Sequence, residues 1–187
     1  MRQFLIWASA VLLSLSSVST TADETRQSIL VTGASTGIGR HLAEALAADG
    51  FHVYAGARKR EDIEALNALD NVTAVRLDVT IQEYVAAAVA MIEASGTGLY
   101  ALVNNAGVGG GGPVAGTAIE EQRFVYDVNV EGVYRVTKAF APLVTASKGR
   151  IAITGSIAGT LSWAGGTAYA GSKHWMEAYA DGLAAEL

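Results

Sequence analysis

Short apolar runs alternate with longer amphipathic stretches from residue 27 to the end of the chain. The short runs are rich in β-branched residues and bounded by glycine and polar residues, as strands are, whereas the longer stretches repeat their apolar positions with helical spacing. This alternation predicts an α/β fold with a doubly wound parallel sheet and helices on both faces. The nearly continuous apolar character of the runs predicts strands buried on both sides. The expected strands cover residues 28–32, 52–56, 73–77, 100–104 and 150–154, and the expected helices cover residues 38–49, 60–69, 81–94, 118–146 and 169–187.

The first 22 residues differ in pattern from the rest of the chain. Arg2 precedes an uncharged stretch of apolar and small residues at 4–18, and small residues at 20–22 precede Asp23. This order predicts a secretory signal peptide. A membrane anchor is one alternative, although the stretch is shorter than the roughly 20 residues that a helix needs to span a bilayer; a wrongly chosen upstream start codon is another. We expect a leader at 1–22, with export (periplasmic or secreted) or membrane association instead of a cytoplasmic location, and one domain at 23–187.

Composition narrows the classes of protein to which the chain can belong. Of the 187 residues, 51% are hydrophobic and 17% are charged, which suits one packed domain and argues against a disordered chain. The net charge is −5 and the 13 Lys and Arg residues are scattered, so no basic stripe is present and nucleic acid is not an expected partner. The chain has no cysteine, and its three histidines lack metal-ligand spacing, so neither a disulfide nor a metal site is expected.

A glycine-rich segment follows the first expected strand and opens the first expected helix. At such a junction, backbone N–H groups and the positive end of the helix dipole can hold a pyrophosphate, provided that no Cβ blocks its approach. The glycine spacing differs from the common dinucleotide fingerprint, yet the strand before it and the helix after it predict a Rossmann-like phosphate loop. The residues of this loop are Gly33, Ser35, Thr36, Gly37, Ile38 and Gly39.

The end of the second expected strand carries a basic residue where a Rossmann-like site meets the adenosine ribose. No carboxylate stands there to accept a bond from a free 2′-hydroxyl, whereas Arg58 offers a charge-assisted contact to the 2′-phosphate of NADP(H). The alternative is a solvated basic run before a helix. The absence of the acid favours NADP(H) over NAD(H).

Four polar residues in the second half of the chain form a recognisable order. Tyr169 and Lys173 lie four positions apart, so a helix places both side chains on one face about one turn apart. Ser156 follows the strand expected at 150–154, near the carboxyl end where parallel sheets place ligands, and Asn129 lies in the long helix expected before that strand. This order and the glycine loop resemble the short-chain dehydrogenase/reductase family, and the resemblance covers residues 28–187.

The resemblance implies a role for each of these four residues. Tyr169 is expected to be the general acid/base, and Lys173 to lower the pKa of the phenol and hold the nicotinamide ribose. Ser156 is expected to polarise the substrate carbonyl, and Asn129 to support a water-linked proton relay. A satisfied buried amide is the structural alternative for Asn129.

The resemblance also implies further cofactor contacts. Asn105, Ala106 and Gly107 follow the strand expected at 100–104 and would line the cofactor, while Asp78 follows the strand expected at 73–77 and would meet the adenine. The alternative for Asp78 is a helix N-cap.

The function implied is hydride transfer between NADP(H) and a small-molecule alcohol or carbonyl. In the family, two further strands, a substrate-covering segment and a Pro-Gly element normally follow the helix that carries Tyr169 and Lys173, and none of them is present here. The expected sheet is therefore incomplete at its C-terminal edge, which is left unprotected. For this reason a dinucleotide-binding module or inactive fragment without turnover is an alternative, as is an exported structural domain. Association into a homo-oligomer is expected through the helices at 118–146 and from 169 onward.

Overall fold

The computed structural model describes residues 26–187, so the predicted leader at 1–22 lies outside the described residues. Within residues 26–187, no helix has the length and apolar character required to cross a membrane. The elements are β1 (Ser28–Val31), α1 (Gly37–Ala48), β2 (His52–Ala57), α2 (Arg60–Asn67), β3 (Val72–Arg76), α3 (Gln82–Ser95), β4 (Ala101–Asn104), α4 (Ile119–Tyr126), the π-helix η1 (Asp127–Glu131), α5 (Gly132–Ala146), β5 (Arg150–Ile153), the 3₁₀-helix η2 (Ile157–Gly159) and α6 (Thr167–Glu186).

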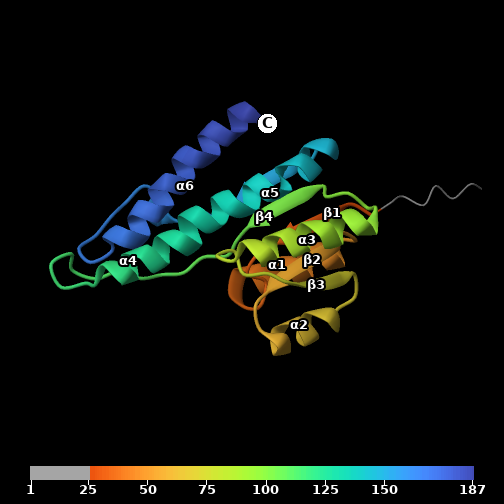
Figure 1. Cartoon of the computed structure of the whole chain (residues 1–187), viewed down its shortest axis with the longest axis horizontal. Helices are drawn as coiled ribbons and strands as arrows, with labels where there is room; N and C mark the ends of the chain where they lie inside the picture. The colour runs from red at the N-terminus through yellow and green to blue at the C-terminus, as the bar shows by residue number, and fades with distance from the viewer. Residues whose placement is uncertain (1–25) are drawn as a thin grey trace, which may run out of the picture.

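The five strands form one sheet in the order β3-β2-β1-β4-β5, and every pair is parallel. The first strand, β1, lies at the centre, with β2 on one side and β4 on the other, so the chain winds outward in both directions from it (Figure 1). The chain passes from β1 through α1 to β2 on one side, and later from β3 through α3 to β4 on the other side of β1. The carboxyl ends of β1 and β4 therefore border the crevice where such sheets bind ligands. The predicted α/β, doubly wound, Rossmann-like fold is confirmed.

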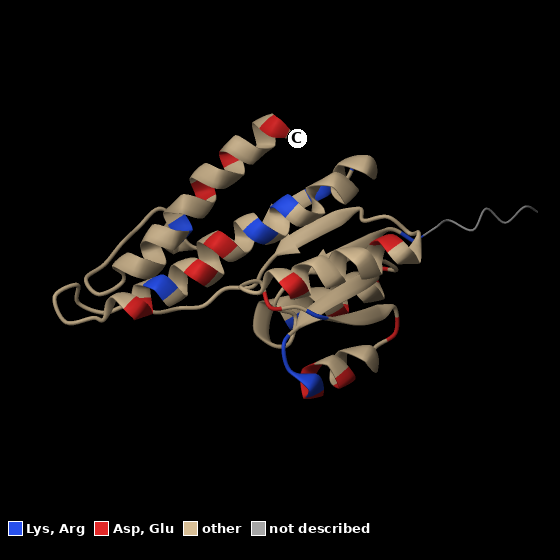
Figure 2. Ribbon diagram, viewed as in Figure 1, with Lys and Arg blue, Asp and Glu red and all other residues tan. Residues whose placement is uncertain are grey.

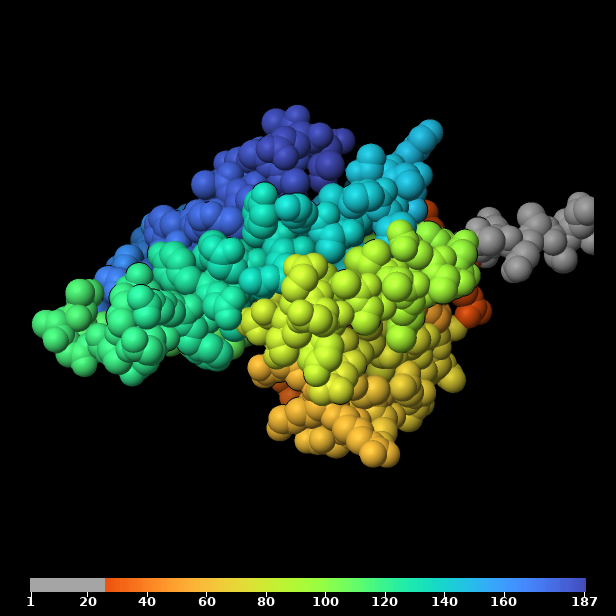
Figure 3. All heavy atoms as spheres, viewed as in Figure 1, coloured from red at the N-terminus to blue at the C-terminus, as the bar shows by residue number. Residues whose placement is uncertain are grey.

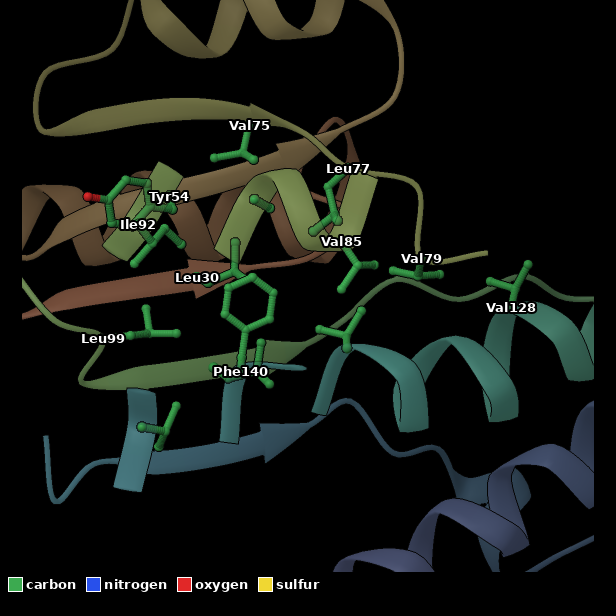
Figure 4. Close-up of a cluster of buried hydrophobic side chains, with 14 residues drawn as sticks. Leu30, Tyr54, Val75, Leu77, Val79, Val85, Ile92, Leu99, Val128 and Phe140 are labelled. Carbon is green, nitrogen blue, oxygen red and sulfur yellow. The ribbon is translucent and has the colours of Figure 1, made fainter. Parts of the chain in front are cut away.

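Alternate residues of the central strand belong to two separate cores. Leu30 packs into a cluster with residues of α3 and α5, whereas its neighbours Ile29 and Val31 pack into a second cluster with residues of α1 and α2. In Figure 4, Phe140 of α5 points toward Leu30 and the sheet, and both side chains are fully buried. Burial on both faces explains why the strand is apolar at Ile29, Leu30 and Val31.

The edge strand β5 differs from the prediction that all strands are buried on both faces. Arg150 and Ala152 are exposed, while Ile151 and Ile153 are only half-buried. Ile151 packs against the cluster formed with α3 and α5, and the described residues leave the opposite face of β5 uncovered. The prediction of two buried faces is therefore wrong for β5, because no helix of the described chain packs on its second face.

The long helix predicted at 118–146 consists of three parts. It runs as α4, then widens into the π-helix η1, and continues as α5. A π-helical turn inserts one residue into the helical repeat and is frequently found at functional sites. Here it contains Asn129, which is fully buried.

Helix α6 lies beside α4, and together they extend beyond the end of the sheet (Figures 1 and 3). A Cβ at Gly171 of α6 would lie 2.6 Å from the hydroxyl oxygen of Tyr126 in α4. This glycine therefore lets the two helices approach closely at the level of Tyr169, which α6 carries in its first turn.

Charged residues of both signs are interspersed along α4 and α5 (Figure 2). The ion pairs of the described chain are mostly exposed and local, such as Arg60 with Glu64 one turn later at 2.7 Å. Pairs of this kind contribute little to stability, typically about 0.3–0.5 kcal/mol. The two apolar clusters on the faces of the sheet therefore hold the fold together.

Candidate functional site

A cleft of about 550 Å³ lies at the carboxyl ends of the strands. It brings together the glycine loop after β1, the ends of β2 and β3, the segments after β4 and β5, and two residues of α6. Every site residue predicted from the sequence lines it except Gly37 and Asn129. Those in the cleft are Gly33, Ser35, Thr36, Ile38, Gly39, Arg58, Asp78, Asn105, Ala106, Gly107, Ser156, Tyr169 and Lys173.

The three glycines of the loop differ in what a side chain would meet at their positions. Gly33 has a φ of +65°, and a Cβ there would lie 2.8 Å from the Cα of Ala106. A Cβ at Gly39 would overlap the carbonyl oxygen of Gly33 and the side-chain nitrogen of Asn105. Gly37 has a φ of +57° and nothing within 4 Å of its Cβ position. Two of the glycines are thus required by the packing of the protein itself, and Gly37 borders open space.

The first turn of α1 offers unpaired backbone donors beside this loop. The opening N–H groups of any helix lack intrahelical acceptors. The side chain of the N-cap residue, Thr36, makes no capping hydrogen bond, and no acidic residue lies in the first turn to offset the helix dipole. The positive end of α1 is therefore available to an anion in the cleft.

Thr32 and Asn105 join the ends of β1 and β4 beneath the loop. The buried Thr32 hydroxyl accepts hydrogen bonds from the backbone N–H groups of Asn105 and Ala106, each at 3.0 Å. The Asn105 side-chain amide donates to the carbonyls of Thr32 (3.0 Å) and Gly33 (3.2 Å). We call these bonds the Thr32–Asn105 clamp, because they fix the glycine loop against the segment after β4.

Arg58 and Asp78 lie at the other end of the cleft. Arg58 is exposed at the end of β2, and within residues 26–187 its guanidinium has no hydrogen-bond or ion-pair partner. Asp78 accepts bonds through Oδ1 from the backbone N–H (3.0 Å) and the hydroxyl (2.7 Å) of Thr80. The N-cap of α3 is Ile81, so the alternative that Asp78 caps this helix is wrong.

Tyr169, Lys173 and Ser156 lie at the opposite end. The Lys173 ammonium is 5.7 Å from the centre of the Tyr169 ring and donates a 2.7 Å hydrogen bond to the carbonyl of Thr154. Burial lowers the pKa of Lys173, and the charge of Glu177 partly opposes this shift. The Ser156 hydroxyl accepts a bond from the Ala158 N–H at 3.1 Å and remains able to donate. A phenol, a hydroxyl and a cation therefore share one end of the cleft.

Asn129 lies behind the cleft and does not line it. Its Oδ1 accepts from the Val108 N–H at 2.8 Å, and its Nδ2 donates to the Val108 carbonyl at 2.9 Å and the Ser172 hydroxyl at 3.0 Å. Ser172 donates in turn to the Tyr169 carbonyl at 2.7 Å. The side chain of Asn129 is thus the satisfied buried amide named as its alternative, and its place in a proton relay stays a prediction.

Two threonines contribute to the site although sequence analysis did not single them out. Thr32 anchors the clamp, and Thr154 lines the cleft beside Lys173. Each is the last residue of a strand expected from the sequence, and each is polar at the end of a largely apolar run. That position was the available signal, because strand ends at this edge of a parallel sheet face the ligand crevice.

Comparison with known proteins identifies the family to which this site belongs. A sequence model described as "short chain dehydrogenase" matches residues 27–187. The chain belongs to the short-chain dehydrogenase family. Its members are oxidoreductases, and the cleft described above occupies the part of the chain that the match covers.

Individual family members agree with this assignment. The uncharacterized oxidoreductase YbbO of Escherichia coli is 37% identical over 164 residues, which are 87% of this chain and 61% of that protein. A short-chain dehydrogenase/reductase from Burkholderia phymatum, solved in complex with NAD, has a TM-score of 0.80 and 32% identity over 87% of this chain and 60% of its own. The closed form of serine dehydrogenase complexed with NADP+ has a TM-score of 0.82 and 29% identity over 86% of this chain and 66% of its own. The chain thus spans 60–66% of the length of these relatives.

We predict that Gly39→Ala destabilises the fold by about 1–3 kcal/mol, because the added methyl group overpacks the loop against Gly33 and Asn105. Gly182→Ala is the matched control, since Gly182 is exposed in α6 with nothing within 4 Å of its Cβ position. The control is expected to be neutral or to stabilise by about 0.5–1 kcal/mol. Urea unfolding of both variants measures the difference, and equal midpoints for Gly39→Ala and the natural protein would show that the loop is not closely packed.

Proposed function

We propose that this chain forms the cofactor-binding and catalytic part of an oxidoreductase that transfers hydride between NADP(H) and an alcohol or carbonyl compound. The observation that carries the proposal is the cleft that holds the open N-terminus of α1 at one end and the Tyr169–Lys173–Ser156 group at the other. Relatives of similar fold bind NAD or NADP+, which supports a nicotinamide dinucleotide as the cofactor.

The residues of the cleft fit such a cofactor along its whole length. The first turn of α1 and the open space at Gly37 would accommodate the pyrophosphate. Asp78 would face the adenine, and Arg58 would face the adenosine ribose. Asn105, Ala106 and Gly107 would line the middle of the cofactor, and Lys173 would hold the nicotinamide ribose. When bound, the nicotinamide supplies or accepts the hydride.

The protein's own residues then have to move one proton. Tyr169 would donate its phenolic proton to the carbonyl oxygen during reduction and take it back during oxidation. The Ser156 hydroxyl would donate a hydrogen bond to the same oxygen and stabilise the negative charge that develops there. The ammonium of Lys173 lies 5.7 Å from the centre of the Tyr169 ring, so the two groups lie together at the reacting end of the cleft.

We predict that Tyr169→Phe lowers kcat by about 100- to 10,000-fold, which is the usual contribution of a positioned acid. The affinity for NADPH is expected to stay nearly unchanged, because the phosphate loop and Lys173 are intact. Tyr134→Phe serves as the control, since Tyr134 is exposed on α5 and does not line the cleft. NADPH oxidation with a panel of ketones and aldehydes measures turnover, and fluorescence titration measures binding.

Two outcomes of this experiment would count against the proposal. Turnover by Tyr169→Phe equal to that of the natural protein would show that another group is the acid. If the natural protein binds NADPH and reduces no compound of the panel, the chain is a dinucleotide-binding module without turnover.

We predict that Arg58→Ala weakens NADPH binding by about 10- to 100-fold, since hydrogen bonds between charged groups contribute about 1.5–3 kcal/mol. The affinity for NADH should change little, because NADH has no 2′-phosphate. Lys59→Ala is the matched control, because its exposed ammonium lies outside the cleft and pairs with Glu61 at 3.8 Å. Titration of both cofactors against all three proteins gives the ratio of affinities. An unchanged ratio in Arg58→Ala would mean that Arg58 belongs to a solvated basic run.

A further inference from the structure

A chain of side-chain hydrogen bonds connects Lys173 to the glycine loop. The Lys173 ammonium donates to the carbonyl of Thr154 at 2.7 Å. The hydroxyl of the same threonine donates to the side-chain oxygen of Asn105 at 3.2 Å, and the amide nitrogen of Asn105 donates to the carbonyls of Thr32 and Gly33. The path therefore runs from α6 through the ends of β5 and β4 to the loop between β1 and α1.

The amide of Asn105 has only one orientation that satisfies these bonds. Its nitrogen faces two carbonyls, so its oxygen must face the Thr154 hydroxyl; a flip would place oxygen against oxygen. A Cβ at Gly39 would overlap this nitrogen, so the glycine packs beside the amide. The Asn105 side chain therefore links the glycine loop to Thr154.

At the other end of the path, the position of Lys173 depends on Thr154. The side chain is 5% exposed, and a buried ammonium requires hydrogen-bond acceptors. Within residues 26–187, the Thr154 carbonyl is the one oxygen that accepts from it, and the sulfur of Met176 is its second contact at 3.3 Å. Its ammonium lies 5.7 Å from the centre of the Tyr169 ring and is affected by the charge of Glu177, and both of these residues lie on α6. Thr154 is therefore the contact that ties Lys173 to the sheet.

We propose that Thr154 is a positioning residue that couples occupation of the glycine loop to the placement of the Lys173 ammonium. The inference rests on the proposed function, in which the loop holds the pyrophosphate and Lys173 serves the reacting end. Binding of the adenosine half of the cofactor would fix the positions of Gly33 and Asn105. Through its hydroxyl, Thr154 would then be held in place, and its carbonyl would hold the Lys173 ammonium. Neither half of the site would then bind independently of the other.

Substitution of Thr154 by valine or by serine distinguishes the effect of its hydroxyl from the effect of its branched shape. Valine keeps the branched shape and removes the donor to Asn105, whereas serine keeps the donor. We predict that Thr154→Val weakens NADPH binding by about 3- to 10-fold, as expected for one neutral hydrogen bond. Thr154→Ser should bind NADPH as the natural protein does. Equal affinities for all three proteins would overturn the proposal.

Lysine side-chain NMR tests the coupling itself without turnover. The probe is ADP, which carries the adenosine and pyrophosphate of either cofactor but no nicotinamide ribose to contact Lys173. The Lys173 ε-carbon signal is assigned by its loss in Lys173→Arg, and the Gly33 amide signal reports that ADP is bound. We expect saturating ADP to shift the Lys173 signal in the natural protein and in Thr154→Ser, and to leave it unshifted in Thr154→Val.

The outcomes distinguish this inference from the proposed function. An equal shift in Thr154→Val, or no shift in the natural protein while the Gly33 signal moves, would overturn the coupling and leave the proposed function standing. If ADP moves neither signal in the natural protein, the cleft does not bind the pyrophosphate, and the proposed function fails together with the inference.

Discussion

The candidate site depends on one buried polar contact, the hydroxyl of Thr32 accepting the backbone N–H groups of Asn105 and Ala106. At the ends of β1 and β4 the ladder of the sheet stops, and these two N–H groups need another acceptor. Thr32 supplies it, and the side chain of Asn105 satisfies the carbonyls of Thr32 and Gly33 in return. These bonds therefore hold the glycine loop and the start of α1 against the segment after β4.

The buried amide of Asn129 fixes the other end of the site, where Tyr169 and Lys173 lie. The π-helix positions Asn129 so that its amide bonds both backbone groups of Val108 and the hydroxyl of Ser172. Since Ser172 lies next to Lys173 on α6, this contact fixes the helix that carries Tyr169 and Lys173 against the segment after β4. Both the glycine loop and the helix that carries Tyr169 are thus hydrogen-bonded to the segment after β4 or to Asn129 beside it. This shared support fixes the distance between the two ends of the cleft.

Much of the fold followed from local patterns, because each apolar run and each amphipathic stretch contains its own periodicity. The glycine loop and the order of Ser156, Tyr169 and Lys173 indicated the family because residue type and spacing can be read directly along the chain. Three features did not follow from the sequence. The exposure of β5 depends on which helices cover the edge of the sheet, and the π-helix at Asn129 depends on contacts with Val108 and Ser172 from distant segments. The importance of Thr32 depends on the pairing of β1 with β4, which places Val31 opposite Val103; no local pattern encodes that register.

The most direct test of this account compares Thr32→Val with Thr32→Ser. Valine has nearly the shape of threonine and cannot accept a hydrogen bond, whereas serine keeps the acceptor. Each amide left without an acceptor costs about 1–3 kcal/mol, so the valine variant should lose stability in urea and bind NADPH at least about 10-fold more weakly. The serine variant should bind NADPH within about 3-fold of the natural protein, which corresponds to less than one ordinary hydrogen bond. If Thr32→Val binds NADPH as tightly as the natural protein and unfolds at the same urea concentration, the Thr32–Asn105 clamp does not organise the cleft and the account is wrong.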